Sequence, residues 1–200
     1  MRLILIRHGQ TDSNVQHLLD TQAPGAPLNE LGLQQARDLV ERISDEPIEA
    51  LYTSHLTRAK QTAEPLASKL ALTPTVLEGL TEISAGDDEM SPDWERYVAV
   101  LESWAPDNLD TGLPGGETAR EFLERYSGAV QEIEAAGHAV AAVVSHGAAI
   151  RVFGLTVHPS LNLETAQPLH NTEWIVLEGS TADGWKVVRW AGIDVDAQEA

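Results

Sequence analysis

The chain alternates between short uninterrupted apolar runs and longer segments in which apolar residues recur at helical spacing. Continuous apolar stretches occupy residues 3–6 and 139–144, and strands are expected over 2–7, 48–53 and 139–145, with a shorter one near 74–77. Continuous runs of Val, Ile, Leu and Ala are typical of strands covered on both faces of a parallel sheet. We therefore expect four buried strands.

The segments between the runs place apolar residues three and four positions apart, as an amphipathic helix does. They predict helices over about 29–44, 57–70, 93–104, 117–136 and 147–155. Asn29 is a suitable N-cap, and Gly137 can serve as the C′ residue of the long fourth helix. Two further strands, 173–178 and 185–190, are joined through Asp183-Gly184, which is a hairpin signal.

This alternation predicts an α/β fold, namely a three-layer α/β/α sandwich around a mostly parallel sheet. Residues 80–116 interrupt the pattern with several Gly and Pro residues, and they predict a lid-like insertion over the domain. The length suits one well-buried domain, so we expect residues 1–200 to form a single domain. The acidic last residues are expected to fray.

The excess of acidic residues argues against nucleic acids and anionic membranes as binding partners. With 13 Lys and Arg against 31 Asp and Glu, the net charge is −18, which repels nucleic acid and anionic membranes. The absence of cysteine excludes disulfides, thiolate metal sites and cysteine nucleophiles. No stretch approaches the roughly 20 apolar residues of a membrane span, and residues 1–6 resemble a strand more than a signal peptide. We therefore expect a cytoplasmic protein.

Two histidines directly follow predicted strands, and each precedes a glycine. Arg7-His8-Gly9 ends the first apolar run, and Ser145-His146-Gly147 ends the run at 139–145. Ligands of α/β sheets bind beyond the carboxyl ends of strands, so both imidazoles are expected in one crevice. Arg7 adds a planar, permanently charged group suited to phosphate oxygens. The pattern indicates phosphate chemistry on histidine.

Two further side chains are expected at the same edge. Arg58 lies at the start of a predicted helix, where a cation is unfavourable unless an anion binds; a surface salt bridge is the alternative explanation. Glu82 follows another strand end between apolar neighbours, where partial burial would suit it for proton transfer. Asp87, Asp88 and Glu89 compete for that role.

A metal site is another interpretation of two histidines and an acid. The chain has no HxxxH or HxH pair, and two neighbouring arginines would repel a cation. We therefore expect neither a metal nor another cofactor. The other histidines are expected to be structural or exposed: His17, His55, His138, His158 and His170.

An ordered set of motifs resembles the histidine phosphatase superfamily, in its phosphoglycerate-mutase-like branch. The set runs from residue 3 to about 177 and includes Arg7-His8-Gly9-Gln10-Thr11-x-x-Asn14, Pro27-Leu28-Asn29-Glu30, Ser54-x-Leu56-x-Arg58-Ala59, Glu82-x-x-x-Gly86, Pro114-Gly115-Gly116-Glu117-Thr118 and Val144-Ser145-His146-Gly147. Single motifs of this kind are common, whereas the ordered set is highly specific.

The resemblance implies a role for each matching residue. His8 would be the nucleophile and become a phosphohistidine, and Glu82 would protonate the leaving oxygen. Arg7, Arg58 and His146 would form the phosphate pocket. The two arginines would also keep His8 neutral and stabilise charge on the transferring phosphoryl group.

Further substrate contacts are expected from three loops. Asn14 would assist the phosphate pocket, and Gly147 opens a helix whose free N–H groups can bind an anion. Thr21 and Gln22 stand where the family usually has a Gln-Gly or Thr-Gly pair, and we assign substrate contacts to them. The family's aromatic and Glu-Gly residues after Gly86 are replaced by acidic ones, which predicts an acidic pocket mouth.

The sequence thus predicts a phosphomonoester hydrolase that acts on a small phosphorylated metabolite through phosphohistidine, as a monomer or homodimer. A phosphoglycerate mutase is the first alternative, but such mutases are longer and carry extra basic residues, whereas residues 83–116 offer only Arg96. A non-catalytic phospho-ligand-binding protein is the second. Binding alone would need neither a nucleophile nor an acid.

Overall fold

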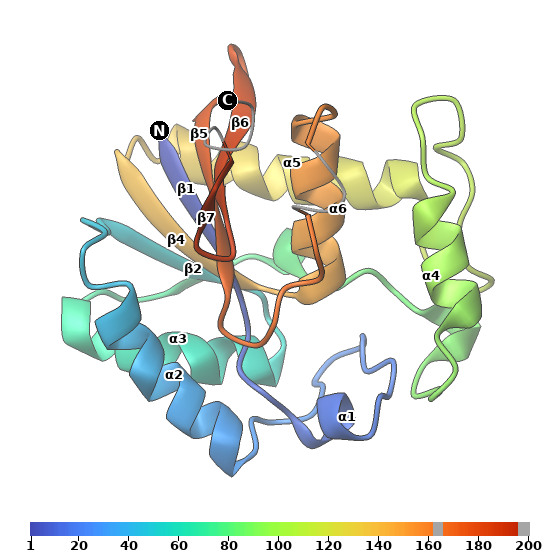
Figure 1. The fold of residues 1–200 in the computed structure, drawn as a ribbon, viewed down its shortest axis with the longest axis horizontal. Coiled ribbons are helices and arrows are strands. Elements are labelled where there is room, and N and C mark those ends of the chain that lie inside the picture. Colours follow the sequence, from blue (N-terminus) through green and yellow to red (C-terminus); the bar gives the residue numbers. More distant parts are fainter. Residues whose placement is uncertain (162–165, 196–200) are drawn as a thin grey trace.

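Seven strands form one mixed sheet in the computed structural model, which describes residues 1–161 and 166–195 (Figure 1). Their order across the sheet is β3-β2-β4-β1-β5-β6-β7. The bounds are β1 (Arg2–Arg7), β2 (Ala50–Thr53), β3 (Thr75–Val76), β4 (Val140–Ser145), β5 (Trp174–Ser180), β6 (Gly184–Trp190) and β7 (Ile193–Asp194).

The sheet is parallel on one side of β1 and antiparallel on the other. Strands β3, β2, β4 and β1 pair in parallel, whereas β5 pairs antiparallel with β1, and β6 and β7 follow as antiparallel neighbours. The antiparallel neighbours β5, β6 and β7 follow one another through tight turns, whereas β5 itself is reached from β4 through α6 (Gly147–Val157) and a segment that reverses its direction relative to β1. The sandwich expected from the sequence is confirmed, with the antiparallel edge making its sheet mixed.

Helices cover both faces of this sheet (Figure 1). Their bounds are α1 (Asp12–Val15), α2 (Glu30–Arg42), α3 (Thr57–Leu70), α4 (Glu95–Glu102), α5 (Ala119–Ala135) and α6 (Gly147–Val157), with short 3₁₀ turns at Glu78–Leu80 and Gly86–Asp88. The predicted helices are confirmed with ends shifted by a few residues, as helix ends commonly are. β7 was not predicted, and the acidic residues 196–200 lie outside the described part of the chain.

The two faces of the sheet carry separate apolar cores because successive side chains of a strand point to opposite sides. In β1, Leu3 and Leu5 pack with residues of α5 and α6, whereas Ile4 and Ile6 pack with residues of α2 and α3. All four side chains are fully buried. The continuous apolar run therefore reflects a strand covered twice.

Local sequence signals fix the helix ends next to the sheet. The Asn29 side chain caps α2 by accepting the backbone N–H of Gly32 at 2.9 Å. A side chain at Gly32 would collide with the backbone carbonyl of Gln10, so glycine lets α2 approach the loop that follows β1. After α5, Gly137 takes a positive φ of 79°, which suits the expected C′ position.

The insertion places α4 beside the main body of the fold, across from α6 (Figure 1). Tyr97 of α4 is buried and donates its hydroxyl to the Ile83 carbonyl at 3.0 Å. Trp104 stacks on Phe122 of α5, with the ring centroids 5.9 Å apart. These contacts attach the insertion to the body, while its behaviour as a lid stays a prediction.

The carboxyl ends of three parallel strands meet at one edge. Arg7 is paired with Ser145 across β1 and β4, and Thr53 is paired with Val144 across β2 and β4. The residues that follow these strands, His8, Ser54 and His146, are therefore neighbours.

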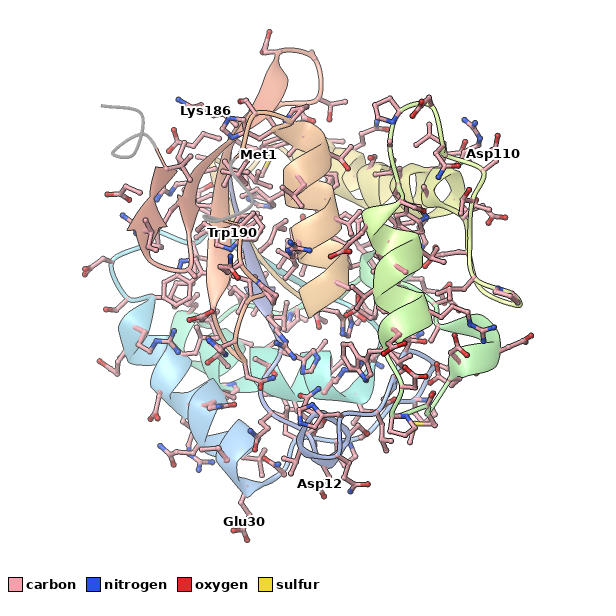
Figure 2. The ribbon with its side chains drawn as sticks, turned by 45° about the vertical axis from the view of Figure 1, so that its right-hand side comes forward. Met1, Asp12, Glu30, Asp110, Lys186 and Trp190 are labelled. Carbon is pink, nitrogen blue, oxygen red and sulfur yellow. The ribbon has the colours of Figure 1, made fainter. Side chains whose placement is uncertain are left out.

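The outer surface carries the acidic excess of the chain. Asp12, Glu30 and Asp110 are exposed and project outward (Figure 2). By contrast, Trp190 is 1% exposed and packs beside Gly154 of α6. Within the described residues, no helix has both the length and the apolar character needed to cross a membrane.

Candidate active site

His8 lies buried at the end of β1 with its two ring nitrogens in different environments. Nδ1 is 2.7 Å from the carbonyl oxygen of Gly9, and Nε2 is 3.0 Å from Nε of Arg58. A carbonyl can only accept and a guanidinium can only donate, so Nδ1 carries the proton and Nε2 holds a lone pair. Nε2 is therefore the nitrogen that can act as a nucleophile.

The same surroundings keep the ring neutral. Burial is the largest cause that lowers the pKa of His8 well below its usual value, followed by the charges of Arg58 and then Arg7. The sequence-based argument credited the two arginines, and the structure corrects that emphasis, because desolvation of the imidazolium contributes more.

Three residues beside His8 each have a buried side-chain nitrogen without a hydrogen-bond partner. Within the part of the chain that the structure describes, four buried side-chain atoms lack a hydrogen-bond partner, and three of them are Arg7 Nε, Arg58 Nη1 and His146 Nδ1. Buried polar atoms are nearly always hydrogen-bonded. A cluster of orphaned donors, two of them on cations, therefore fits a bound oxyanion.

Backbone carbonyl groups fix the orientation of both arginine side chains. Arg7 Nη1 donates to the carbonyl of Leu169, and Arg58 Nη2 donates to the carbonyl of Asp20 at 2.7 Å. Burial is the largest cause lowering the pKa of both guanidinium groups. Asp20 supplies one opposite charge, with its Oδ1 3.6 Å from Nη1 of Arg58, and an anion bound between the two arginines would supply another.

The ring of His146 faces His8, with the two centroids 5.2 Å apart. Its Nε2 is 2.8 Å from the hydroxyl of Ser54, which already accepts the backbone N–H of Leu56 at 3.2 Å. If the Ser54 hydroxyl donates its proton to Nε2, the ring proton of His146 lies on Nδ1. His146 would thus donate a hydrogen bond from Nδ1 toward the anion.

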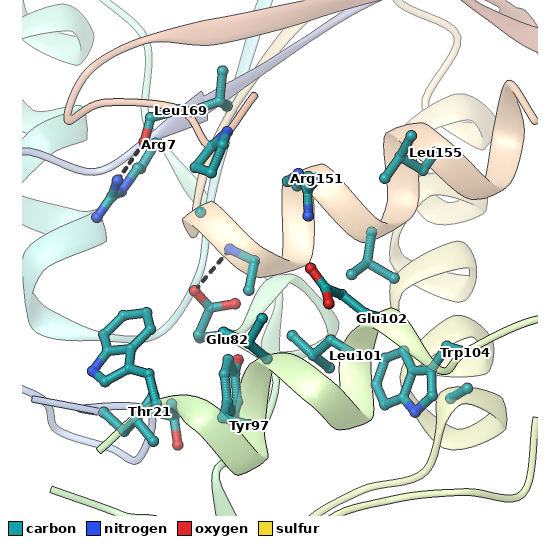
Figure 3. A pocket seen from close by; sticks show the side chains of 18 of the residues that line it. Arg7, Thr21, Glu82, Tyr97, Leu101, Glu102, Trp104, Arg151, Leu155 and Leu169 are labelled. Atoms are coloured by element: carbon teal, nitrogen blue, oxygen red, sulfur yellow. Dashed lines mark hydrogen bonds between the residues drawn. The ribbon is translucent and has the colours of Figure 1, made fainter. Parts of the chain in front are cut away.

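Glu82 sits at the N-terminus of α6 and lines the same cavity as His8 (Figure 3). Its carboxylate accepts the backbone N–H groups of Ala148 at 3.2 Å and Ala149 at 2.8 Å, together with that of Ile83 at 2.9 Å. These bonds hold the carboxyl group in a fixed orientation.

The competing acids are engaged elsewhere. Asp88 forms an ion pair with Arg96, and Glu89 accepts the backbone N–H groups of Thr21 and Gln22. Neither these two acids nor Asp87 are among the described residues that line the cavity. The acidic stretch is thus largely bonded to its neighbours instead of facing the substrate.

The remaining predicted contact residues differ in position. Asn14, Thr21 and Gly147 line the cavity, whereas Gln22 is exposed and lies outside its described lining. The hydroxyl of Thr21 bonds to Glu89 and accepts the backbone N–H of Ala85, so this side chain supports the cavity wall. The structure therefore places Gln22 where it makes no contact with the cavity.

Comparison with known proteins decides the family. The model of the histidine phosphatase superfamily (branch 1) matches residues 3–192. The chain belongs to this superfamily. The resemblance drawn from the ordered motifs is thereby confirmed.

Relatives of this histidine phosphatase include the PE-PGRS family protein PE_PGRS11 of Mycobacterium tuberculosis, 32% identical over 95% of this chain and 36% of that protein. The chain thus spans about a third of the length of that relative. The uncharacterized phosphatase PhoE of Bacillus subtilis is 35% identical over 73% of this chain and 72% of its own. A mycobacterial glucosyl-3-phosphoglycerate phosphatase in complex with VO3 has 26% identity, with a TM-score of 0.79 over 96% of this chain and 99% of that one. The expected enzyme class, a histidine phosphatase, is confirmed.

Three supporting residues of this histidine phosphatase were not identified from its sequence. Ser54 orients His146, Asp20 orients Arg58, and Asn171 donates its amide to the carbonyl of His8 at 3.0 Å and to Oδ1 of Asn14 at 3.2 Å. Asn171 follows a segment with no strand or helix pattern, so no local signal marks it. The position of Ser54 directly after an apolar run could have identified it.

Acidification is expected to destabilise this histidine phosphatase below about pH 6.5. The pKa values of His8 and His146 are both lowered in the fold, chiefly by burial, so the unfolded chain binds protons first as the pH falls. Each histidine should therefore remove up to about 1.4 kcal/mol of unfolding free energy per pH unit below about 6.5. Urea unfolding at pH 7.5 and 5.5 measures this loss.

Matched variants assign that loss to the buried rings. His8→Gln and His146→Gln should each reduce the difference in unfolding free energy between the two pH values. His138→Gln should leave it unchanged, because His138 is 40% exposed in its side chain. An unchanged pH dependence in both active-site variants would contradict the assignment.

Proposed function

We propose that this histidine phosphatase hydrolyses phosphomonoesters of small metabolites through a phosphohistidine formed on Nε2 of His8. The observation that carries the proposal is an unprotonated Nε2 on His8, whose neighbours Arg7, Arg58 and His146 each have a buried side-chain nitrogen without a hydrogen-bond partner. A phosphoryl group placed among these donors would present its phosphorus to the lone pair of Nε2. The relatives named as phosphatases support the same chemistry.

The first half-reaction forms one bond and breaks one bond. Nε2 of His8 attacks phosphorus while the ester oxygen leaves, and protonated Glu82 donates its proton to that oxygen. Arg7, Arg58 and His146 stabilise the equatorial oxygens during transfer. In the second half-reaction Glu82 accepts a proton from water, the hydroxide attacks phosphorus, and the electron pair of the N–P bond returns to Nε2.

The charges of the cavity favour hydrolysis over the mutase alternative. Its described lining holds three arginines, Arg7, Arg58 and Arg151, and three carboxylates, Asp20, Glu82 and Glu102. With the first two arginines assigned to the phosphoryl group, only Arg151 remains for the second anionic group of a phosphoglycerate. A nearby carboxylate, Glu102, would oppose that group.

The remaining assignments follow from the same considerations. We propose one histidine phosphatase domain over residues 1–200, acting as a monomer or homodimer in the cytoplasm. Its partner would be a small phosphorylated substrate, with no nucleic acid or membrane partner, because the net charge of −18 repels both. No cofactor enters the proposed steps.

Hydrolysis is expected to continue unchanged in EDTA, because the arginines carry the charge stabilisation that a metal would otherwise supply. Among residues 1–161 and 166–195, no group of three or more His, Asp or Glu side chains is placed to hold a metal ion. A panel of phosphomonoesters assayed by phosphate release, with and without the chelator, tests both the activity and this expectation. Loss in EDTA that a divalent cation restores would contradict the arginine-based pocket, and no release from any ester would contradict the proposed function.

A further inference from the structure

The cavity that holds His8 extends far beyond the phosphate-binding donors. Its volume is about 1010 Å³, at the upper end of the roughly 300–1,000 Å³ of pockets that enclose a drug-sized ligand. A phosphoryl group would occupy only its catalytic end. The remaining space must therefore accommodate the alcohol part of a substrate.

The distal part of the cavity has largely apolar walls, and we call it the distal chamber. Helix α4 and the segment after it form one wall and α6 forms the other, with Trp104 and Leu155 at the end away from Arg7 (Figure 3). The chamber is defined by these apolar lining residues: Trp94, Val98, Leu101, Trp104, Pro106, Leu109, Leu123, Val152, Leu155, Pro159 and Leu161.

Two of these side chains remain unusually exposed. Trp94, which directly precedes α4, is 39% exposed and Val98 of α4 is 40% exposed, although both line the cavity. Apolar surface that faces a pocket in this way gains free energy when an apolar ligand covers it. Two charged residues, Glu102 and Arg151, also line this part of the cavity. Their charges have opposite signs, so together they add no net charge to the apolar walls.

We propose that the distal chamber selects phosphomonoesters whose alcohol is a large apolar group, an aliphatic chain or an extended ring system. The inference rests on the proposed function, because the phosphoryl group must lie at His8 for its alcohol to reach the chamber. The phosphate-binding end and the distal chamber belong to one continuous cavity, which is lined by His8 at one end and by Leu155 at the other. The alcohol part of an ester bound at His8 would therefore extend into the chamber. A compact polar alcohol such as a sugar would leave the apolar walls uncovered.

A series of primary alkyl phosphates tests the proposal. Ethyl, butyl, hexyl and octyl phosphate, used below their micellar concentrations, have leaving groups of nearly equal basicity, so their differences report binding. Burial of one methylene is worth at most about fourfold in affinity. We expect kcat/KM to rise about two- to fourfold per methylene, and glucose 6-phosphate to fall well below octyl phosphate. Equal values for ethyl and octyl phosphate, or a preference for glucose 6-phosphate, would overturn the proposal.

Variants of the chamber locate the effect. Val98→Asn and Leu155→Asn place an amide in the apolar walls and should each reduce the ratio of octyl to ethyl kcat/KM by about fivefold or more. The rate with ethyl phosphate should fall much less than the rate with octyl phosphate. Leu31→Asn is the matched control, because Leu31 is 51% exposed on α2 and lies outside the described cavity lining. A ratio unchanged in both chamber variants would overturn the location.

A binding measurement separates this proposal from the proposed function. Calorimetric titration with ethylphosphonate and octylphosphonate, which cannot be hydrolysed, should show much tighter binding of the longer compound. Tighter binding without hydrolysis of any ester would support the chamber and contradict the phosphatase activity. Equal affinities for the two phosphonates would overturn the chamber while leaving the phosphatase proposal intact.

Discussion

Replacing His8 by alanine is expected to lower phosphatase turnover by roughly 10⁴- to 10⁶-fold, the scale on which loss of a nucleophile acts in covalent catalysis. The lone pair of Nε2 is the electron pair that forms the bond to phosphorus, and no described neighbour can replace it, because Arg7, Arg58 and His146 each present a donor. Steady-state kinetics with an aryl phosphate measures the loss. Rapid acid-free quenching with labelled substrate should trap a base-stable, acid-labile adduct on His8.

A second histidine serves as the control for that experiment. His138→Ala removes an exposed imidazole next to Glu49 and should retain full activity. Circular dichroism of both variants checks that the fold persists. Label recovered on a residue other than His8, or normal turnover in His8→Ala, would end the proposed mechanism.

Glu82→Gln is expected to reduce the hydrolysis of ethyl phosphate by about 10²- to 10⁴-fold, the usual contribution of a general acid. Ethoxide is a strongly basic leaving group and needs the proton of Glu82, whereas 4-nitrophenolate is stable as an anion. Hydrolysis of 4-nitrophenyl phosphate should therefore fall much less. Pre-steady-state measurement of the phosphorylation step isolates this effect from the hydrolysis of the phosphoenzyme.

Glu102→Gln provides the matched control, because it removes another carboxylate of the same cavity without touching the N-terminus of α6. It should affect both esters alike. Equal losses for the two esters in Glu82→Gln would show that Glu82 only positions the site. A larger loss in a variant of Asp87, Asp88 or Glu89 would assign the proton to that residue instead.

These expectations depend on the tautomer of His8, which is a property of the folded chain. The carbonyl of Gly9 fixes the proton on Nδ1, and Arg58 approaches Nε2 from a helix that begins 49 positions later in the chain. The sequence shows that His8 follows a strand, but it does not show which ring nitrogen faces the substrate.

The arrangement of strands could be predicted in part. The strands at 2–7 and 139–145 were expected to belong to one parallel sheet, and β1 and β4 do pair in parallel, although the sequence did not predict that they would be neighbours. The antiparallel pairing of β1 with β5 was not expected, because pairing depends on the route of a connection and leaves no pattern in the strand itself. The hairpin between β5 and β6 was predicted, since its turn is local.

The sequence by itself determined most of the helices and strands, the family and the chemical groups at the carboxyl edge, because each depends on local periodicity or on ordered motifs around His8, Arg58 and His146. Only the tertiary structure decided which acid faces the cavity, which residues hold the arginines in place, and that α4 and α6 enclose an apolar chamber. The physical reason is that burial, orphaned donors and cavity shape arise between segments far apart in the chain, so no local pattern encodes them.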